Sequence, residues 1–116
     1  MGKKKKKYQG RVWIGFDLGG TKMLAKVFND DYQTLGRAKQ KTHGAKGAKS
    51  GLARMVETIE EALDDAGVDA DAIAGIGVGC PGPINPGSGR IVEAPNLGWR
   101  NVPVEEHLAD AFDAQV

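Results

Sequence analysis

VWIGFDLGGTKMLAKVF, residues 12–28, is the stretch with the clearest structural signal in this chain. Residues 11–18 are mostly apolar and rich in β-branched and aromatic side chains, which predicts a strand. Gly19 and Gly20 then indicate a tight turn. Residues 22–28 alternate in part between apolar and polar side chains, as a second strand would. The stretch therefore predicts a β-hairpin with two glycines at its tip.

The segments after this hairpin include two predicted helices. Their apolar side chains recur at helical spacing, so each helix has one face suited to a core. For the first helix we expect an N-cap at Ser50, an end at Ala66 and a C-cap at Gly67. For the second we expect a first turn at Pro103 and an end near Ala114. The core-facing side chains are expected to be Leu52, Met55, Val56, Ile59, Leu63 and Ala66 in the first helix, and Val104, Leu108, Ala111 and Phe112 in the second.

The remaining segments differ in polarity. Residues 32–42 are polar enough for a strand at a sheet edge, where lysines discourage pairing with another sheet. Residues 72–78 form an apolar run that suits a strand covered on both faces. Residues 79–90 are so rich in glycine and proline that we expect no regular structure there. The other expected elements are a loop over residues 43–51, a short strand over residues 90–94 and a loop over residues 95–101.

The predicted order is β-β-β-α-β-α, which defines an α/β fold. Three hairpin-linked strands, followed by a helix that crosses to a buried strand, form half of a ribonuclease-H-like sheet. Such a sheet has one more strand and helix, so residues 11–116 are expected to be a lobe truncated before them. Residues 1–10 are expected to be a disordered lysine-rich tail, because five adjacent ammonium groups repel one another.

The composition excludes several classes of protein. One cysteine rules out an internal disulfide and a four-thiolate metal site. No run approaches the ~18 apolar residues that cross a bilayer, and no signal-peptide core follows the lysines, so we expect a cytoplasmic protein without membrane contact. Apart from the five lysines of residues 3–7, eleven basic residues stand against fifteen acidic ones, a balance of −4 that argues against nucleic-acid binding.

Glycine is about twice as frequent as usual, with 17 among 116 residues, and it forms two motifs. The motif GVGCPG, residues 77–82, has the spacing of a dinucleotide-binding loop. That function also requires a helix to begin there, which Pro81, Pro83 and Pro86 disfavour. No G-x-x-x-x-G-K-[ST] motif occurs, so a P-loop is excluded.

The other glycine motif is DLGGTK, residues 17–22, at the tip of the hairpin. Glycines let a phosphate approach the backbone amides, while Thr21 adds a hydroxyl donor and Lys22 a positive charge. Asp17 precedes the turn and is a carboxylate of the kind that holds Mg²⁺ through oxygen. From these residues alone, a phosphate-binding turn and a plain glycine hairpin with incidental charges are equally good interpretations.

Three motifs together resemble the ROK family of sugar kinases and repressors. IGFDLGGTK, residues 14–22, is similar to the N-terminal phosphate motif of the family. GVGCPGPI, residues 77–84, resembles its second glycine-proline loop, and APNLGW, residues 94–99, resembles an element of its glucokinases. The three motifs occur in the family's order and at its spacing, so the resemblance favours the phosphate interpretation of the turn.

The resemblance implies an actin-like ATPase fold of two lobes, of which residues 11–116 are the N-terminal one. It implies an ATP-dependent sugar kinase that transfers a phosphoryl group from MgATP to a hexose, glucose above all, and a homo-oligomeric full-length protein. An amide side chain suits the sugar site because it both donates to and accepts from a hydroxyl. The implied contacts are Asp17, Gly19, Gly20, Thr21 and Lys22 for the nucleotide phosphates, Asp17 for Mg²⁺, and Gly82 and Asn96 for the sugar.

The family's catalytic base, an Asp that follows an Asn, is expected beyond Val116, as are a second phosphate loop and a Cys/His zinc site. We therefore expect no catalytic residue within residues 1–116, and an isolated chain that is inactive and poorly stable. Asp110 and Asp113 belong to the predicted last helix and lack the context of a base.

Two other functions remain open. One is a sugar-responsive ROK-type regulator, which usually carries a DNA-binding domain ahead of the motif that begins at Asp17. Sixteen residues precede Asp17 in this sequence, which disfavours this function. A non-catalytic fragment or regulatory module would keep half a nucleotide site. Cys80 and Trp99 are expected to be packing residues, with sugar stacking as the alternative for Trp99.

Overall fold

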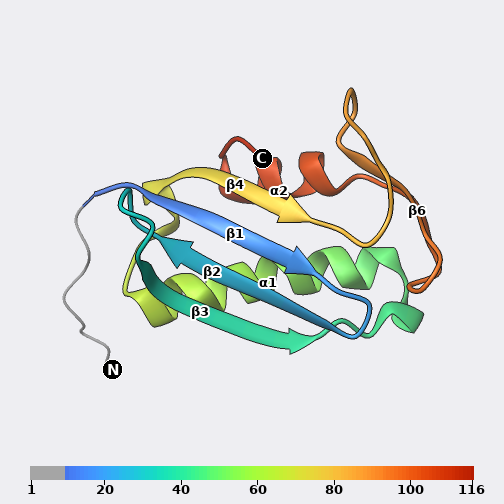
Figure 1. The fold of residues 1–116 in the computed structure, drawn as a ribbon, viewed down its shortest axis with the longest axis horizontal. Coiled ribbons are helices and arrows are strands. Elements are labelled where there is room, and N and C mark those ends of the chain that lie inside the picture. The colour runs from blue at the N-terminus through green and yellow to red at the C-terminus, as the bar shows by residue number, and fades with distance from the viewer. Residues whose placement is uncertain (1–9) are drawn as a thin grey trace.

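Two α-helices, two short 3-10 helices and two sheets make up residues 10–116, the part of the chain that this computed structural model describes (Figure 1). The expected tail therefore lies outside the described residues, apart from Gly10. In chain order the elements are β1 (Val12–Leu18), β2 (Lys22–Phe28), β3 (Thr34–Lys41), η1 (Gly44–Lys46), α1 (Ala48–Ala66), η2 (Ala70–Ala72), β4 (Ile73–Gly79), β5 (Ile84–Asn85), β6 (Arg90–Ala94), β7 (Trp99–Val102) and α2 (Val104–Phe112).

The larger sheet has the strand order β3-β2-β1-β4. β1 and β2 are antiparallel with Leu18 opposite Met23, and β2 and β3 are also antiparallel. β1 and β4 are parallel, and α1 lies in the connection that leads back to β4. This is the predicted three-stranded meander followed by a helical crossover, so the α/β fold class is confirmed.

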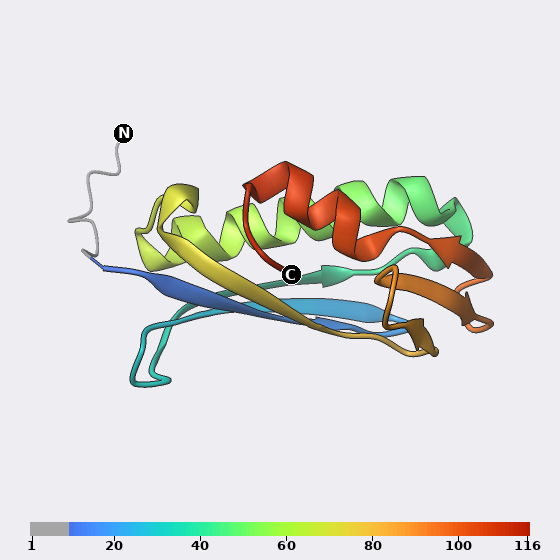
Figure 2. The same ribbon diagram turned by 90° about the horizontal axis from the view of Figure 1, so that it is seen from above.

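Both α-helices lie on one side of the larger sheet (Figure 2). Because side chains alternate along a strand, each strand has a covered face beneath the helices and an open face opposite. The hydrophobic core includes the side chains of the covered face. The covered face carries Val12, Ile14, Phe16, Leu18, Met23, Ala25 and Val27, all buried, and the open face carries Trp13, Gly15, Asp17, Lys22, Leu24, Lys26 and Phe28.

The helices bury most of the side chains that their spacing predicted. In α1 the predicted set is buried except Val56 and Ala66, which are half-buried, and Thr58 and Ala62 are buried in addition. In α2 the prediction for Ala111 is wrong, because that residue is exposed. α1 packs so closely on β3 that a Cβ at Gly36 would lie 2.5 Å from the backbone nitrogen of Ala66.

The predicted start is wrong by three residues for α1 and by one residue for α2. The N-cap of α1 is Gly47, whose φ of 96° favours glycine. Ser50 lies instead within the first turns, where its Oγ accepts a hydrogen bond from Arg54 Nη2. The C-cap at Gly67 is confirmed, since its N–H donates to Asp64 O and Leu63 O. In α2, Pro103 is the N-cap rather than the first turn, and the helix ends at Phe112.

A second sheet, of order β5-β6-β7, combines the strand predicted over residues 90–94, which is confirmed as β6, with two segments that were expected to be irregular. Residues 79–90 include β5, which pairs with β6 through a turn in which Asn85 Oδ1 accepts hydrogen bonds from the amides of Gly87 and Ser88. Residues 95–101 include the start of β7, whose end residues Trp99 and Val102 are buried. Both predictions were wrong because short strand pairing and burial outweighed the local preference of proline and glycine for loops.

β4 lies at the edge of the larger sheet and is only partly covered. Ile76 is its one buried residue, while Gly77 and Gly79 are exposed, so the predicted coverage on both faces is wrong for the described residues. The C-terminal segment reaches this edge, where the Ile76 N–H donates to Gln115 O at 2.9 Å. Within the described residues no helix is both long and apolar enough to cross a membrane.

Candidate functional site

The turn between β1 and β2 is tightly closed and exposed. The Gly19 N–H donates to Lys22 O at 2.9 Å, and a Cβ at Gly19 would lie 2.6 Å from that same oxygen. Gly20, Thr21 and Lys22 are exposed at the tip. The turn therefore needs glycine at position 19 and presents its backbone and polar side chains to solvent, as a phosphate-binding turn must.

Asp17 lies on the open face just before this turn. Its neighbours in the sheet are Leu24 on β2 and Gly79 on β4, and its side chain is exposed. Because β1 and β4 are parallel, their carboxyl ends meet at one edge of the sheet, which is where ligands bind in parallel α/β sheets. The two glycine motifs of the sequence, at residues 17–22 and 77–82, thus begin beside each other.

Asn96 lies next to the turn although it is distant in the sequence. A Cβ built on Gly20 would be 3.8 Å from the Asn96 Cβ. Asn96 is exposed in the tight connection between β6 and β7, where the amides of Leu97 and Gly98 donate to Ala94 O. Figure 1 shows the β1–β2 turn beside the chain that follows β6. The fold therefore brings one predicted sugar residue against the predicted phosphate turn.

Gly82 has a different structural reason for being glycine. A Cβ at this position would overlap the Glu93 backbone and lie 3.3 Å from the Ala94 Cα. The loop after β4 therefore crosses β6 in direct backbone contact. Gly82 shapes this loop whether or not a ligand is bound, so its predicted part in the sugar site stays a prediction.

The structure adds Lys41 to the residues around the turn. Lys41 is the direct cross-strand neighbour of Lys22, and both side chains are exposed. Like charges directly opposite each other are unfavourable in a sheet. Lys26 and Arg37 form a second such pair on the same face. The sequence shows these cations, but only the β2–β3 register reveals that they are paired.

Asp17 is a single carboxylate rather than part of a metal cluster. Within residues 10–116, no group of three or more His, Cys, Asp or Glu side chains is placed to hold a metal ion. Mg²⁺ at phosphoryl-transfer sites is usually bound by one or two carboxylates together with substrate phosphates. An exposed carboxylate beside the predicted phosphate turn fits an ion held in that way.

Cys80 and Trp99 fit packing roles. Cys80 is half-buried, and burial raises the pKa of its thiol, which disfavours the nucleophilic thiolate. Trp99 is 2% exposed, and its Nε1 donates to Gly44 O at 3.2 Å. The ring packs so tightly on Gly51 that a Cβ there would overlap it. The alternative of sugar stacking on Trp99 is wrong, because the ring is buried.

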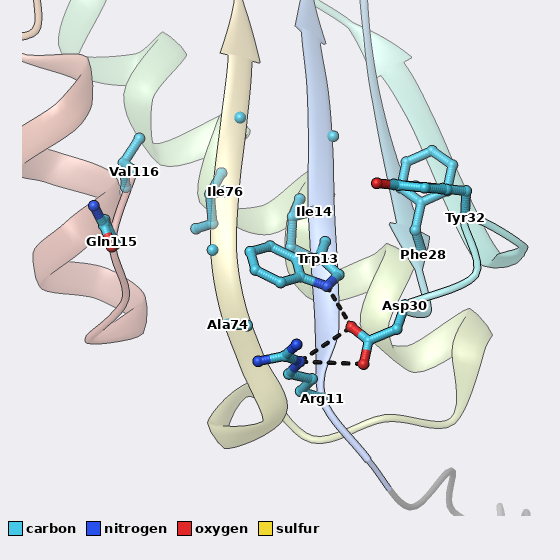
Figure 3. A pocket seen from close by; sticks show the side chains of 13 residues that line it. Arg11, Trp13, Ile14, Phe28, Asp30, Tyr32, Ala74, Ile76, Gln115 and Val116 are labelled. Carbon is cyan, nitrogen blue, oxygen red and sulfur yellow. Dashed lines mark hydrogen bonds and ion pairs between the residues drawn. The ribbon is translucent and has the colours of Figure 1, made fainter.

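A hollow of about 810 Å³ lies on the open face, at the amino end of β1 and away from the turn (Figure 3). At its rim Asp30 accepts hydrogen bonds from Trp13 Nε1 at 2.8 Å and from Arg11 Nε at 3.1 Å. The bond from Trp13, and then the bond and charge of Arg11, hold the pKa of Asp30 below its ordinary value. The lining includes Gly15, Gly75 and Gly77. The Phe28 ring covers Gly15 and the Trp13 ring covers Gly75, whereas the space above Gly77 is open.

The sheet order and the turn between β1 and β2 define a lobe of the actin-like ATPase fold. The chain belongs to the ROK family, which matches residues 13–116. It is 34% identical over 97 residues to a glucokinase of Thermotoga maritima, covering 83% of this chain and 29% of that protein. It is 30% identical over 112 residues to a xylose repressor of Caldicellulosiruptor bescii, covering 89% of this chain and 26% of the repressor.

A solved structure supports the same placement. The ROK hexokinase from Thermus thermophilus is 31% identical and superposes with a TM-score of 0.79, covering 90% of this chain and 33% of the hexokinase. The chain thus spans about a third or less of the length of each of these relatives. The family contains both sugar kinases and repressors, and the chain resembles members of each kind.

Proposed function

We propose that this chain is the nucleotide-binding lobe of an ATP-dependent hexose kinase of glucokinase type. The observation that carries the proposal is the proximity of Gly20 to Asn96, since a Cβ built on Gly20 would lie 3.8 Å from the Asn96 Cβ, which puts the predicted phosphate turn beside an amide suited to a sugar hydroxyl. The glucokinase and hexokinase relatives support glucose as the first substrate to test.

In this proposal the turn binds the phosphates of ATP. The amides around Gly20, the Thr21 hydroxyl and the Lys22 ammonium supply hydrogen bonds and positive charge at fixed positions. Phosphoryl transfer depends chiefly on such positioning and charge neutralisation, since the protein takes little covalent part. Asp17 would hold Mg²⁺, which neutralises charge on the phosphates when bound.

Asn96 and the loop at Gly82 form part of the sugar site in this proposal. The Asn96 amide can accept from one hydroxyl and donate to another, which fixes the orientation of the sugar. Because Asn96 lies near Gly20, a hexose held by Asn96 would lie at the end of the phosphate turn. Proximity of this kind lowers the barrier by fixing the reacting groups before the reaction.

The test is Asp17→Asn in the full-length protein, assayed for ATP-dependent phosphorylation of glucose. We expect turnover to fall by about 100-fold or more, because a charge that acts on the transferring group is lost. The urea midpoint should not change, since Asp17 is exposed. Asp31→Asn, an exposed carboxylate in the β2–β3 turn, is the matched control and should keep normal turnover. Unchanged turnover in Asp17→Asn would remove Asp17 from the proposed mechanism.

A second candidate is a sugar-responsive transcriptional regulator. The observation that favours it is the 30% identity to the xylose repressor over most of this chain. The full-length protein would then bind sugar without forming ADP, and the sugar would change its affinity for DNA. ADP formation that depends on both glucose and ATP supports the kinase instead.

A further inference from the structure

We propose that Thr42 is a positioning residue that holds the phosphate turn in its binding conformation. This inference rests on the proposed binding of nucleotide phosphates at residues 19–22. Thr42 directly follows β3 and is 0% exposed, so it is no candidate for contact with the nucleotide itself. It acts on the turn from behind, through two hydrogen bonds.

Both hydrogen bonds end on backbone carbonyls of the turn. Thr42 Oγ1 donates to Gly19 O at 2.9 Å, and the Thr42 N–H donates to Thr21 O at 2.8 Å. These carbonyls lie on either side of Gly20. The one residue that follows β3 therefore fixes two of the peptide units that make up the turn.

The orientation of these carbonyls determines where the neighbouring amides point. The described residues contain no cis peptide bond, and in a trans peptide the C=O and the N–H point in opposite directions. The N–H groups of Gly20 and Lys22 share peptide units with the carbonyls that Thr42 holds. They consequently point away from Thr42, so that both donors are aligned before an anion arrives.

Thr42 is itself fixed to α1 by Arg54. Arg54 Nη1 donates to Thr42 O at 2.8 Å, and Nη2 donates to Ser50 Oγ at 2.8 Å. A guanidinium makes such paired bonds in a rigid geometry. The turn is thereby connected through Thr42 and Arg54 to the helix on the covered face.

Thr58 offers a matched control for the substitution. It is also a threonine with 0% exposure, and its hydroxyl donates to Arg54 O at 2.7 Å. Its other partners are Gln40 Nε2 at 2.6 Å and Met23 Sδ at 3.4 Å, and none of these groups belongs to the turn. Removing either hydroxyl deletes hydrogen bonds made by a fully buried side chain, so both variants should lose stability.

The first experiment compares Thr42→Val, Thr42→Ser and Thr58→Val in the full-length protein. We expect Thr42→Val to raise the Kd and KM for MgATP about fivefold, the effect of one net hydrogen bond, with the KM for glucose unchanged. Thr42→Ser keeps the hydroxyl and should restore both values to within about twofold. Thr58→Val should lower the urea midpoint without changing the KM for MgATP. Equal changes of that KM in Thr42→Val and Thr58→Val would overturn the proposal.

The second experiment needs no nucleotide, so it separates this inference from the proposed function. Amide hydrogen exchange of residues 19–22 is measured by NMR in the same variants without ligand. We expect faster exchange of the Gly19 amide, which is bonded to Lys22 O, in Thr42→Val than in Thr58→Val. If the wild-type protein binds no MgATP, the proposed function is wrong. The exchange rates still test whether Thr42 fixes the conformation of residues 19–22. Identical exchange in the two valine variants would overturn the role of Thr42 even in an active kinase.

Discussion

The two faces of the larger sheet differ sharply, although the same strands form both. The covered face of β1 and β2 is apolar and buried, and α1 packs on β2 and β3. The open face carries Asp17, paired cations and a hollow. Neighbouring residues of one strand thus have different roles, since one side chain adds to the core and the next lies on the open face. Substitutions on the two faces should accordingly change different measurements.

The largest expected effect is on the covered face. Ile59 in α1 is 0% exposed, and Ile59→Ala should lower the free energy of unfolding by about 2–5 kcal/mol, because it removes apolar contacts and leaves a cavity. Leu24→Ala, at a half-buried position on the open face, should cost clearly less. Urea unfolding followed by circular dichroism measures both variants. Equal losses would mean that the two faces contribute alike to stability.

Two glycines provide a second test of the same difference. A Cβ at Gly36, on the covered face, would lie within 2.8 Å of the backbone of α1, so Gly36→Ala should cost about 1–3 kcal/mol through overpacking. A Cβ at Gly77, on the open face, meets nothing within 4 Å, so Gly77→Ala should stay within about 0.5 kcal/mol of the wild type. Thermal unfolding of the two variants compares them directly. A loss at Gly77 as large as that at Gly36 would show that the open face is packed in solution.

Substitution of one of the paired lysines, Lys22 and Lys41, should have a smaller effect. It should increase the stability of the fold but weaken the binding of MgATP. Lys41→Gln removes the cation opposite Lys22, so the free energy of unfolding should rise by about 0.2–1 kcal/mol. The same substitution removes positive charge beside the phosphate turn, so binding of MgATP, measured by calorimetry, should weaken. Lys39→Gln is the control, because Lys39 lies opposite Leu24 rather than another cation. A change of the same size and sign in both variants would indicate a general effect of charge.

The smallest effect concerns Asp30 at the rim of the hollow. Its pKa in the folded protein is lowered, first by the hydrogen bond from Trp13 and then by Arg11, so the ionised form favours the folded state. This contribution is present above its ordinary pKa of 3.8 and is lost as the pH falls through the lowered value. The urea midpoints of wild type and Asp30→Asn should therefore differ at neutral pH and converge in acid. In the Trp13→Phe background the Asp30→Asn substitution should change the urea midpoint much less at neutral pH, because the main cause of the lowered Asp30 pKa is gone. A midpoint difference between wild type and Asp30→Asn that does not depend on pH would contradict the stabilising role of ionised Asp30.

Much of the larger sheet could be predicted from local patterns. The hairpin at residues 12–28, the apolar stripe of α1 and the C-cap at Gly67 each rest on residues close together in the sequence. In the smaller sheet only β6 was predicted, over residues 90–94, whereas β5 and β7 escaped prediction because they are short and are stable only when paired. One local signal was available, since Asn85 begins a turn with Pro86 and Gly87 between the apolar residues Ile84 and Ile91.

The sequence indicated the turn at residues 17–22 as a candidate site, but it did not indicate which distant residues lie around this turn. Residues 17–22 carry their polar groups in a single motif, so the turn itself was readable from the sequence, but its phosphate interpretation rested on the resemblance to the ROK family rather than on composition and spacing. The position of Asn96 beside Gly20 depends on how the smaller sheet packs, and the pairing of Lys41 with Lys22 depends on strand register. No sequence pattern indicates Thr42, because its proposed role depends on hydrogen bonds to the backbone carbonyls of Gly19 and Thr21.

The chain contains two tryptophans, and each occupies one side of the molecule. Trp13 on the open face is 38% exposed, whereas Trp99 is 2% exposed and lies against Gly51 of α1. Their fluorescence should therefore differ, with emission at longer wavelength and ready acrylamide quenching for Trp13, and emission at shorter wavelength with little quenching for Trp99. In Trp13→Phe the remaining emission reports whether the smaller sheet stays docked on α1. An optical signal intrinsic to the chain thus follows the open face and the core separately.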